Sequence, residues 1–233
     1  MKGGLILYDA AQGGKVHEHI FAPAYWRARD AMGDSLGGRG GAWRIETDDV
    51  DWVLRFYRRG GLPGKFIDDW YLFTGIESTR AWREWRLLAW MHENDLPVPR
   101  PVAARVLQGW LGYRAALVTE TVPGDSLTHL VLQNAMTETA WRAVGRCIRR
   151  IHDAGVWHAD LNAHNILVDA VAADEPHVFV LDFDRGRIRP QDMAWRRANL
   201  ARLKRSMLKV TNGMPQAKAA ESGWQLIESG YRN

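Results

Sequence analysis

The sequence predicts an α+β protein with two lobes, a small β-rich one followed by a mainly helical one. Two observations lead to this class: strand-like segments with turn residues fill the first half, and helical periodicity dominates the second half. The 233 residues, 46% of them hydrophobic and 25% charged, can form a sizeable core, which excludes disorder for most of the chain. We expect the lobes to cover residues 1–120 and 121–233.

In the first lobe, short strands are expected at residues 43–45 and 51–57, on either side of an acidic turn. A cluster of glycines precedes the first strand (Gly37, Gly38, Gly40 and Gly41). Because glycine has no Cβ, such a cluster lets the backbone approach a ligand closely. The helix expected next covers residues 78–93, and two further strands follow at 103–107 and 113–120.

The second lobe begins with a helix expected over residues 137–154, whose apolar residues share one stripe (Trp141, Val144, Ile148 and Ile151). Two short strands follow at 165–168 and 177–181. The last expected elements are a basic helix over 191–209 and a helix near 216–228. The order of strands, helix, strands and then mostly helices assigns the chain to the α+β class.

Cysteine content and hydropathy exclude several classes of protein. The single cysteine, Cys147, excludes a disulfide framework and a Cys-based zinc site, and it fits a reducing compartment. No apolar segment approaches the roughly 20 residues needed to cross a bilayer. The apolar stretch near the N-terminus, residues 5–8, is too short for a signal peptide. We therefore expect a protein of the cytoplasm.

Charge is unevenly distributed along the chain. Residues 185–209 hold nine Lys or Arg and one acid, Asp192, a net charge of +8 in a chain whose total is +4. Asp192 alone cannot pair with so many cations. The segment therefore indicates an anionic partner, such as nucleic acid, an anionic membrane surface or a phosphorylated substrate, with a solvated helix face as the alternative.

The residues that indicate chemistry are His158-Ala-Asp-Leu-Asn-Ala-His-Asn165 and Val180-Leu-Asp-Phe-Asp184. The first segment has the spacing H-x-D-L-x-x-x-N, and the second places Asp182 after an apolar strand. These are the spacings of a kinase catalytic loop and metal-binding turn. Each residue alone has a structural explanation, but five positions in the required order favour phosphoryl transfer.

Phosphoryl transfer explains why these residue types are needed. One carboxylate must orient the attacking hydroxyl and accept its proton, and Asp160 is placed for that role. Magnesium prefers hard oxygen ligands, which Asn165 and Asp182 supply. His158 is expected to tie the catalytic loop to the metal-binding turn through hydrogen bonds.

The sequence resembles the eukaryotic-protein-kinase-like fold, and the resemblance assigns further residues to ATP. The glycine cluster corresponds to the glycine-rich loop that covers the phosphates. Arg55 stands in place of the family's phosphate-binding lysine, with Arg58 as the competitor for that role. Val53, on the same strand face as Arg55, can pack on adenine.

The resemblance also assigns an ion pair and a hinge. Glu84 lies on the core-facing stripe of its helix and is expected to pair with Arg55; the alternative is a partner on its own helix. Residues 117–121, which include Glu120, resemble the hinge whose backbone binds adenine. Asp182-Phe-Asp184 replaces the D-F-G of protein kinases. Because only 49 residues follow Asp184, the second lobe is expected to be shortened and the acceptor not to be a folded protein.

Several details narrow the resemblance to the bacterial lipopolysaccharide kinases, over roughly residues 20–210. They are the glycine cluster with Arg39, the run 54–61, the loop H-A-D-L-N-A-H-N, and Arg185 and Arg187 after the metal-binding turn. Among these kinases the sequence is most similar to members that act on the sugar 3-deoxy-D-manno-octulosonic acid (Kdo).

This resemblance implies ATP and Mg²⁺ as cofactors and phosphorylation of the 4-hydroxyl of Kdo on Kdo-lipid IVA. It implies a peripheral protein at the cytoplasmic face of the inner membrane of a Gram-negative bacterium. The expected partners are the lipid-linked Kdo acceptor and an anionic membrane surface, with neither a nucleic acid nor a protein partner.

Other readings remain open. A lipopolysaccharide heptose kinase shares the same motifs, and so does an aminoglycoside or choline-type kinase, although the basic helix argues against a cationic substrate. A pseudokinase that only binds membranes would not need Asp160, Asn165 and Asp182 together. A nucleic-acid-binding module would explain the charge but not the catalytic loop.

Overall fold

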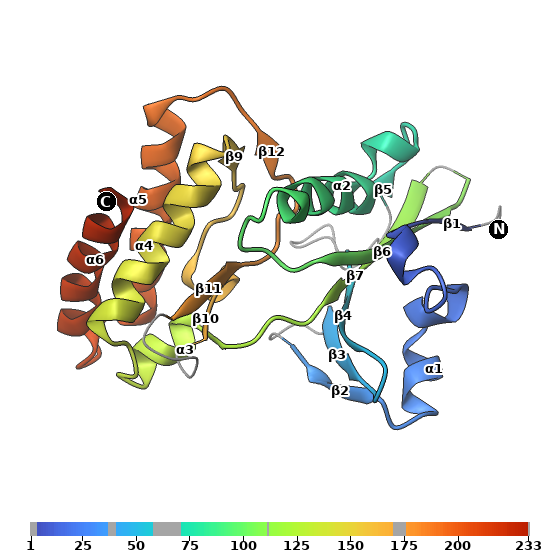
Figure 1. Ribbon diagram of the computed structural model, residues 1–233, viewed down its shortest axis with the longest axis horizontal. Coiled ribbons are helices and arrows are strands. Elements are labelled where there is room, and N and C mark those ends of the chain that lie inside the picture. Colours follow the sequence, from blue (N-terminus) through green and yellow to red (C-terminus); the bar gives the residue numbers. More distant parts are fainter. Residues whose placement is uncertain (1–3, 37–40, 58–70, 111, 170–175, 233) are drawn as a thin grey trace. The chain divides into compact units, whose positions relative to one another are not determined.

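The computed structural model describes residues 4–36, 41–57, 71–110, 112–169 and 176–232 (Figure 1). The chain divides into two compact units, one of Met1–Trp90 and Arg100–Thr121 and the other of Met91–Pro99 and Val122–Asn233. The first unit is built on a large sheet and the second is mainly helical, so the predicted α+β class is confirmed.

An antiparallel seven-stranded sheet forms the frame of the first unit, in the order β1-β6-β7-β4-β3-β2 with β5 beside β7. Its strands are β1 (Gly4–Tyr8), β2 (Met32–Ser35), β3 (Ala42–Glu46), β4 (Asp51–Phe56), β5 (Tyr71–Leu72), β6 (Pro101–Gln108) and β7 (Gly112–Glu120). The sequence predicted β3, β4, β6 and β7 to within two residues. It did not predict β1, β2 or β5, which are short and depend on pairing with a neighbouring strand.

Different elements pack against the two faces of this sheet. The 3-10 turn Glu18–Phe21 and helix α1 (Pro23–Arg27) bury Ile20, Phe21 and Trp26 against one face, where Trp52 and Leu54 of β4 also lie. Helix α2 (Arg80–Glu93) contacts residues of the opposite face. Residues 76–78 form a 3-10 turn, so α2 begins two residues later than predicted.

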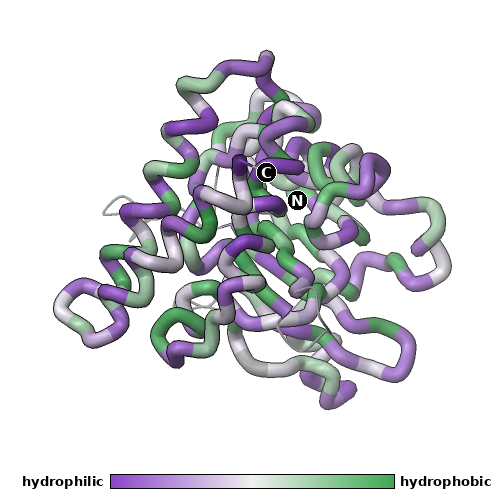
Figure 2. Tube along the Cα trace, turned by 60° about the vertical axis from the view of Figure 1, so that its left-hand side comes forward, coloured by the Kyte–Doolittle hydropathy of each residue, from purple (hydrophilic) through white to green (hydrophobic). Residues whose placement is uncertain are grey.

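The α-helices in the described part of the second unit are α3 (Leu127–Leu132), α4 (Glu138–Asp153), α5 (Met193–Val210) and α6 (Ala217–Arg232). Its strands are short: β8 (Asp125–Ser126), β9 (Val156–Trp157), β10 (Ile166–Asp169), β11 (His177–Val180) and β12 (Arg187–Ile188). The sequence predicted α4, α5, α6, β10 and β11, but not α3, β8, β9 or β12. In Figure 2, hydrophobic and hydrophilic residues alternate along the helices, as amphipathic helices require.

The closest packing in the second unit lies between α4 and α6. The predicted apolar stripe of α4 is buried, and two glycines let the helix backbones approach. A Cβ at Gly145 would lie 2.2 Å from the Ile227 carbonyl oxygen, and one at Gly230 would lie 2.1 Å from the Arg142 carbonyl oxygen. Among the described residues, no helix has the length and apolar character that spanning a bilayer requires.

Candidate active site

In the first unit, Arg55 of β4 and Glu84 of α2 form an ion pair. Arg55 Nη2 donates to Glu84 Oε1 at 2.5 Å, and the Tyr57 hydroxyl donates to Oε2 of the same carboxylate at 2.5 Å. The guanidinium also lies over the Tyr57 ring, 4.8 Å from Cζ to the ring centroid. The structure thus brings together the two residues that were expected to pair.

Burial explains the need for this pair. The Glu84 side chain is 1% exposed, and a buried carboxylate is costly unless its charge is compensated and its oxygens are hydrogen-bonded. The Arg55 side chain keeps 24% of its surface exposed, so a ligand can reach the guanidinium. Tyr57, which the sequence did not assign to the site, supplies the second hydrogen bond to Glu84.

Two other residues expected at the nucleotide, Val53 and Gly41, belong to the described part of the same sheet region. Val53 and Arg55 lie two residues apart on β4, where they pair with Thr119 and Leu117 of β7. Because side chains alternate along a strand, both point to the same face of the sheet. Gly41 accepts a hydrogen bond from the Phe56 N–H at 2.7 Å. Four candidates lie outside the described residues: Gly37, Gly38, Gly40 and Arg58.

Glu120 ends β7 with its side chain in another network. Gln12 Nε2 donates to Glu120 Oε1 at 3.0 Å, and Arg100 Nη1 lies 3.7 Å from the same oxygen. Arg100 is in turn paired with Asp9 at 2.6 Å. The side chain of Glu120 therefore joins a polar cluster, and only its backbone remains a candidate for the nucleotide.

In the second unit, His158 links the catalytic loop to the metal-binding turn, as expected. Its Nδ1 accepts from the Asp160 N–H at 3.0 Å, so Nε2 carries the proton and donates to the Leu181 carbonyl at 2.9 Å. Burial lowers the pKa of His158, which favours this neutral form, although the Leu181 carbonyl opposes the shift. The ring lies 4.7 Å from the fully buried ring of Phe183.

Asn165 is oriented by the backbone of Asp160. Its Nδ2 donates to the Asp160 carbonyl at 3.1 Å, which leaves Oδ1 as the atom that can ligate a cation. Asn162, which the sequence did not assign to the site, holds the same carbonyl at 2.9 Å and accepts from the N–H groups of His164 and Asn165. An Asn before a short helical turn is a recognisable signal for such a cap.

Asp182 lies at the same end of the β10–β11 hairpin as Asn165, because Leu181 N–H donates to the Asn165 carbonyl at 2.8 Å. Its φ is 60°, a value that is uncommon for a residue other than glycine and often marks a functional turn. The exposed carboxylate and the Asn165 amide oxygen are the hard ligands that Mg²⁺ combines with phosphate and water oxygens. Among the described residues, no group of three or more His, Cys, Asp or Glu side chains could hold a metal ion.

Helix α5 holds the catalytic loop through residues at helical spacing i, i+3 and i+7. Asn199 exchanges two hydrogen bonds with the backbone of His158, at 3.2 and 2.9 Å, and Ser206 Oγ accepts from Ala163 N–H at 3.2 Å. Between them, Arg202 Nε donates to Asp160 Oδ1 at 2.9 Å, and Arg202 Nη2 binds the same oxygen.

These contacts correct the expectation that the cations of this helix have no acid to pair with except Asp192. Asp192 instead caps α5 by accepting from Ala194 N–H at 2.8 Å. Arg196 pairs with Asp153 of α4 at 2.8 Å, and Arg202 pairs with Asp160. The sequence could not show this, because both acids lie about 40 residues before their partners.

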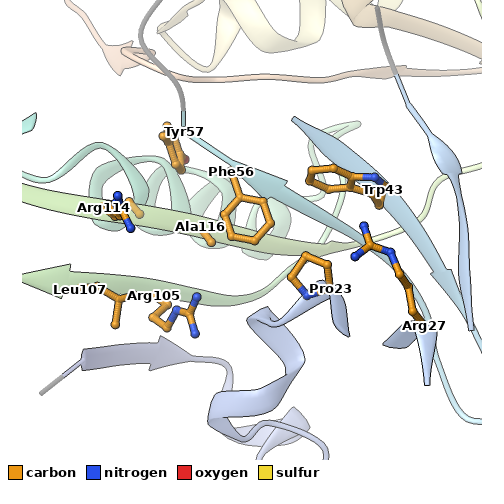
Figure 3. A pocket seen from close by; sticks show the side chains of 10 residues that line it. Pro23, Arg27, Trp43, Phe56, Tyr57, Arg105, Leu107, Arg114 and Ala116 are labelled. Atoms are coloured by element: carbon orange, nitrogen blue, oxygen red, sulfur yellow. The ribbon is translucent and has the colours of Figure 1, made fainter. Parts of the chain in front are cut away.

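A pocket of about 410 Å³ in the first unit has Tyr57, the hydrogen-bond partner of Glu84, among its lining residues (Figure 3). Its lining includes Trp43 and Phe56 together with the three cations Arg27, Arg105 and Arg114. Phe56 faces the side of β4 opposite to Arg55, since successive residues of a strand point to opposite faces. The pocket was not predicted, because its residues come from five separate segments.

Comparison with known proteins identifies relatives over most of the chain. The sequence pattern of the lipopolysaccharide kinase (Kdo/WaaP) family matches residues 23–231. A protein from Actinobacillus succinogenes named 3-deoxy-D-manno-octulosonic acid kinase is 43% identical over 219 residues, which are 92% of this chain and 90% of that protein. A protein of the same name from Xanthomonas campestris pv. campestris (strain B100) is 44% identical over 207 residues, 89% of this chain and 81% of the relative.

A solved structure supports the kinase-like fold. The chain aligns with WaaP in complex with acyl carrier protein with a TM-score of 0.58 and 18% sequence identity, over 98% of this chain and 89% of that one. At this identity the likeness concerns the fold alone.

Proposed function

Because the chain belongs to the lipopolysaccharide kinase (Kdo/WaaP) family, we propose that it is an ATP-dependent kinase that phosphorylates the 4-hydroxyl of Kdo on Kdo-lipid IVA during synthesis of the lipopolysaccharide core. The observation that carries this function is the identity of 42–44% to relatives named for that activity, over about nine-tenths of the chain. The arrangement of His158, Asp160, Asn165 and Asp182 supports it independently.

In this mechanism, Asp160 orients the acceptor hydroxyl and accepts its proton as the oxygen attacks the γ-phosphorus of ATP. A new P–O bond forms, the bond to the β-phosphate oxygen breaks, and ADP leaves with that electron pair. Asn165 and Asp182 would hold magnesium, which would neutralise charge on the phosphates. The Asp160 carboxylate is kept in place by Arg202, and the Asp160 backbone by His158, Asn162 and Asn165.

In this proposal, residues of the first unit bind the phosphates of ATP. Arg55 binds them with its guanidinium, and Glu84 fixes the guanidinium in one orientation. The glycine cluster covers the phosphates, Val53 packs on adenine, and the backbone near Glu120 binds its edge.

We also propose that the protein is peripheral to the cytoplasmic face of the inner membrane. Two features support this placement. The cations of α5 that face solvent and have no carboxylate partner among the described residues are Arg197, Lys204, Arg205 and Lys209. In the first unit, Trp110 at the tip of the β6–β7 hairpin is 95% exposed, and Trp is a side chain that favours the membrane–water interface.

The function is tested by measuring transfer from [γ-³²P]ATP to three acceptors in parallel. We expect phosphorylation of Kdo-lipid IVA and little transfer to a heptosylated core or to an aminoglycoside. Preference for the heptosylated core would assign the chain to a heptose kinase instead, and preference for the aminoglycoside would contradict the lipid-linked acceptor.

A further inference from the structure

Arg202 contacts the carboxylate of the proposed catalytic base on one oxygen only. Both of its hydrogen bonds go to Asp160 Oδ1, and among the described residues no donor reaches Oδ2. The side chains of Arg202 and Asp160 are each 49% exposed. Oδ2 is therefore open to an acceptor hydroxyl, and much of the guanidinium beside it is open to the same molecule.

The guanidinium of Arg202 has N–H groups that Asp160 does not engage. Arginine carries five N–H groups, and Asp160 engages only one on Nε and one on Nη2. The two N–H groups of Nη1 and the second one of Nη2 have no partner among the described residues. A second carboxylate can bind there without displacing Asp160, because the planar fork of arginine suits bidentate contacts with carboxylates.

The position of Arg202 on α5 is set by its neighbours. Asn199, three residues earlier, is tied to the backbone of His158, and Ser206, four residues later, is tied to Ala163. These hydrogen bonds tie the helix to the catalytic loop on both sides of Arg202 and so hold the guanidinium beside Asp160. Such preorganisation is what a specificity contact requires.

We propose that Arg202 selects a carboxylate-bearing acceptor, by binding the acceptor's carboxylate with the N–H groups that Asp160 leaves unused. This inference rests on the proposed function, in which the acceptor hydroxyl lies on Asp160 Oδ2. In a 3-deoxy-2-ulosonic acid, the carboxyl group is attached to C2, and the C4 hydroxyl lies two ring carbons away. A sugar whose 4-hydroxyl is on Asp160 therefore brings its carboxylate near the neighbouring guanidinium.

The test compares Kdo-lipid IVA with the same lipid whose Kdo carboxyl is reduced to an alcohol. With the wild-type enzyme, kcat/KM should be about 10- to 100-fold higher for the acid, the range expected for hydrogen bonds between charged groups. Arg202→Gln should abolish this preference and leave the KM for ATP nearly unchanged. Any loss of Asp160 positioning lowers transfer to both acceptors by the same factor, so the ratio of the two kcat/KM values reports the carboxylate contact.

A matched control is Arg149→Gln, which removes a different Arg–Asp pair of the same unit, Arg149 Nε to Asp153 Oδ2 at 2.6 Å, and should keep the preference. Equal kcat/KM for the two acceptors with the wild-type enzyme would overturn the inference without any variant. A preference that persists in Arg202→Gln would overturn it as well and leave Arg202 as a positioning residue. Failure of the wild type to phosphorylate either Kdo lipid would instead remove the proposed function on which the inference rests.

Discussion

The backbone and the side chain of Asp160 are each held by hydrogen bonds from different residues. Its N–H is bound by His158, its carbonyl by the amides of Asn162 and Asn165, and one carboxylate oxygen by Arg202. Each contact fixes one atom, and none of the described residues donates to the remaining carboxylate oxygen, Oδ2. A general base must be placed within hydrogen-bond reach of the proton it removes, and this arrangement meets that need.

We expect Asp160→Ala to lower kcat by about 10²-fold or more, in line with the usual contribution of a positioned base, while ATP affinity changes little. Asp182→Ala should instead impair the use of Mg·ATP, because it removes a metal ligand. Steady-state kinetics at varied ATP and Mg²⁺ would separate the two effects. Wild-type turnover in either variant would contradict its assigned role.

Replacing Arg55 tests the phosphate-binding assignment. Arg55→Ala should raise the KM for ATP and reduce turnover, and it should also lower the melting temperature, because the buried carboxylate of Glu84 loses its cation. Arg55→Lys restores the charge but not the planar fork, so it should recover stability better than activity.

The matched comparison for Arg55 is Arg58→Ala, for which a smaller effect on the KM for ATP is expected. A larger loss of ATP binding in Arg58→Ala than in Arg55→Ala would reverse the assignment of the two arginines.

At the scale of elements, α5 combines two roles on different faces. One side carries Asn199, Arg202 and Ser206, which bind the catalytic loop, and the solvent side carries cations that have no carboxylate partner among the described residues. A test of membrane binding must therefore leave Arg202 unchanged.

We expect the triple variant Arg197→Glu, Arg205→Glu and Lys209→Glu to release the protein from anionic vesicles and to raise the KM for the lipid-linked acceptor. Each cation near an anionic leaflet contributes about 1 kcal/mol, and exposed charges are screened beyond about 8 Å at physiological ionic strength. Vesicle sedimentation with increasing salt measures the effect, and the KM for ATP should barely change. Unchanged vesicle binding would show that this face of α5 is only exposed to solvent and does not bind the membrane.

The contact between α4 and α6 depends on glycine. We expect Gly230→Ala to destabilise the protein by about 1–3 kcal/mol or more, because the new methyl group would overlap the Arg142 carbonyl oxygen, a backbone atom that cannot move alone. Thermal unfolding measures the loss. The control is Gly14→Ala, where an added Cβ would meet no atom within 4 Å and no substantial change is expected.

At the scale of the whole molecule, burial of histidine links folding to pH. Burial lowers the pKa of His152 from 6.5 to about 4, although a hydrogen bond with Asn199 and the nearby charge of Asp153 act in the opposite direction. The folded state keeps this ring neutral, packed against Trp195 and bonded to the Tyr231 hydroxyl at 2.8 Å. In the unfolded chain the same ring takes up a proton near its ordinary pKa.

Stability should therefore fall as the pH drops from about 6.5 towards 4, because the unfolded state binds a proton that the folded state does not. For His152 the loss can reach about 3 kcal/mol once the pH is below the folded-state pKa. Urea unfolding at pH 7, 5.5 and 4.5 would show it, and His152→Gln should flatten the dependence. The control His177→Gln alters an exposed histidine, and an equal flattening there would contradict the explanation.

The sequence by itself determined the fold class and the family, and it predicted which residues form the catalytic loop. These depend on local order and spacing: Asp160, Asn165 and Asp182 are recognisable because phosphoryl transfer needs those groups at those intervals. The pairing of Arg55 with Glu84 could also be predicted, since a carboxylate on a core-facing helix stripe requires a cation.

Only the tertiary structure decided which partners the remaining charged and polar residues take. The short strands β1, β2 and β5 exist through pairing with neighbours, and the contacts of Arg202 and Arg196 join residues about 40 positions apart. Helical spacing showed that α5 is basic, but not that one side of it holds the catalytic loop. Hydropathy and charge patterns record a residue's tendency to be exposed, whereas the choice among several possible partners depends on distances that arise when the elements pack.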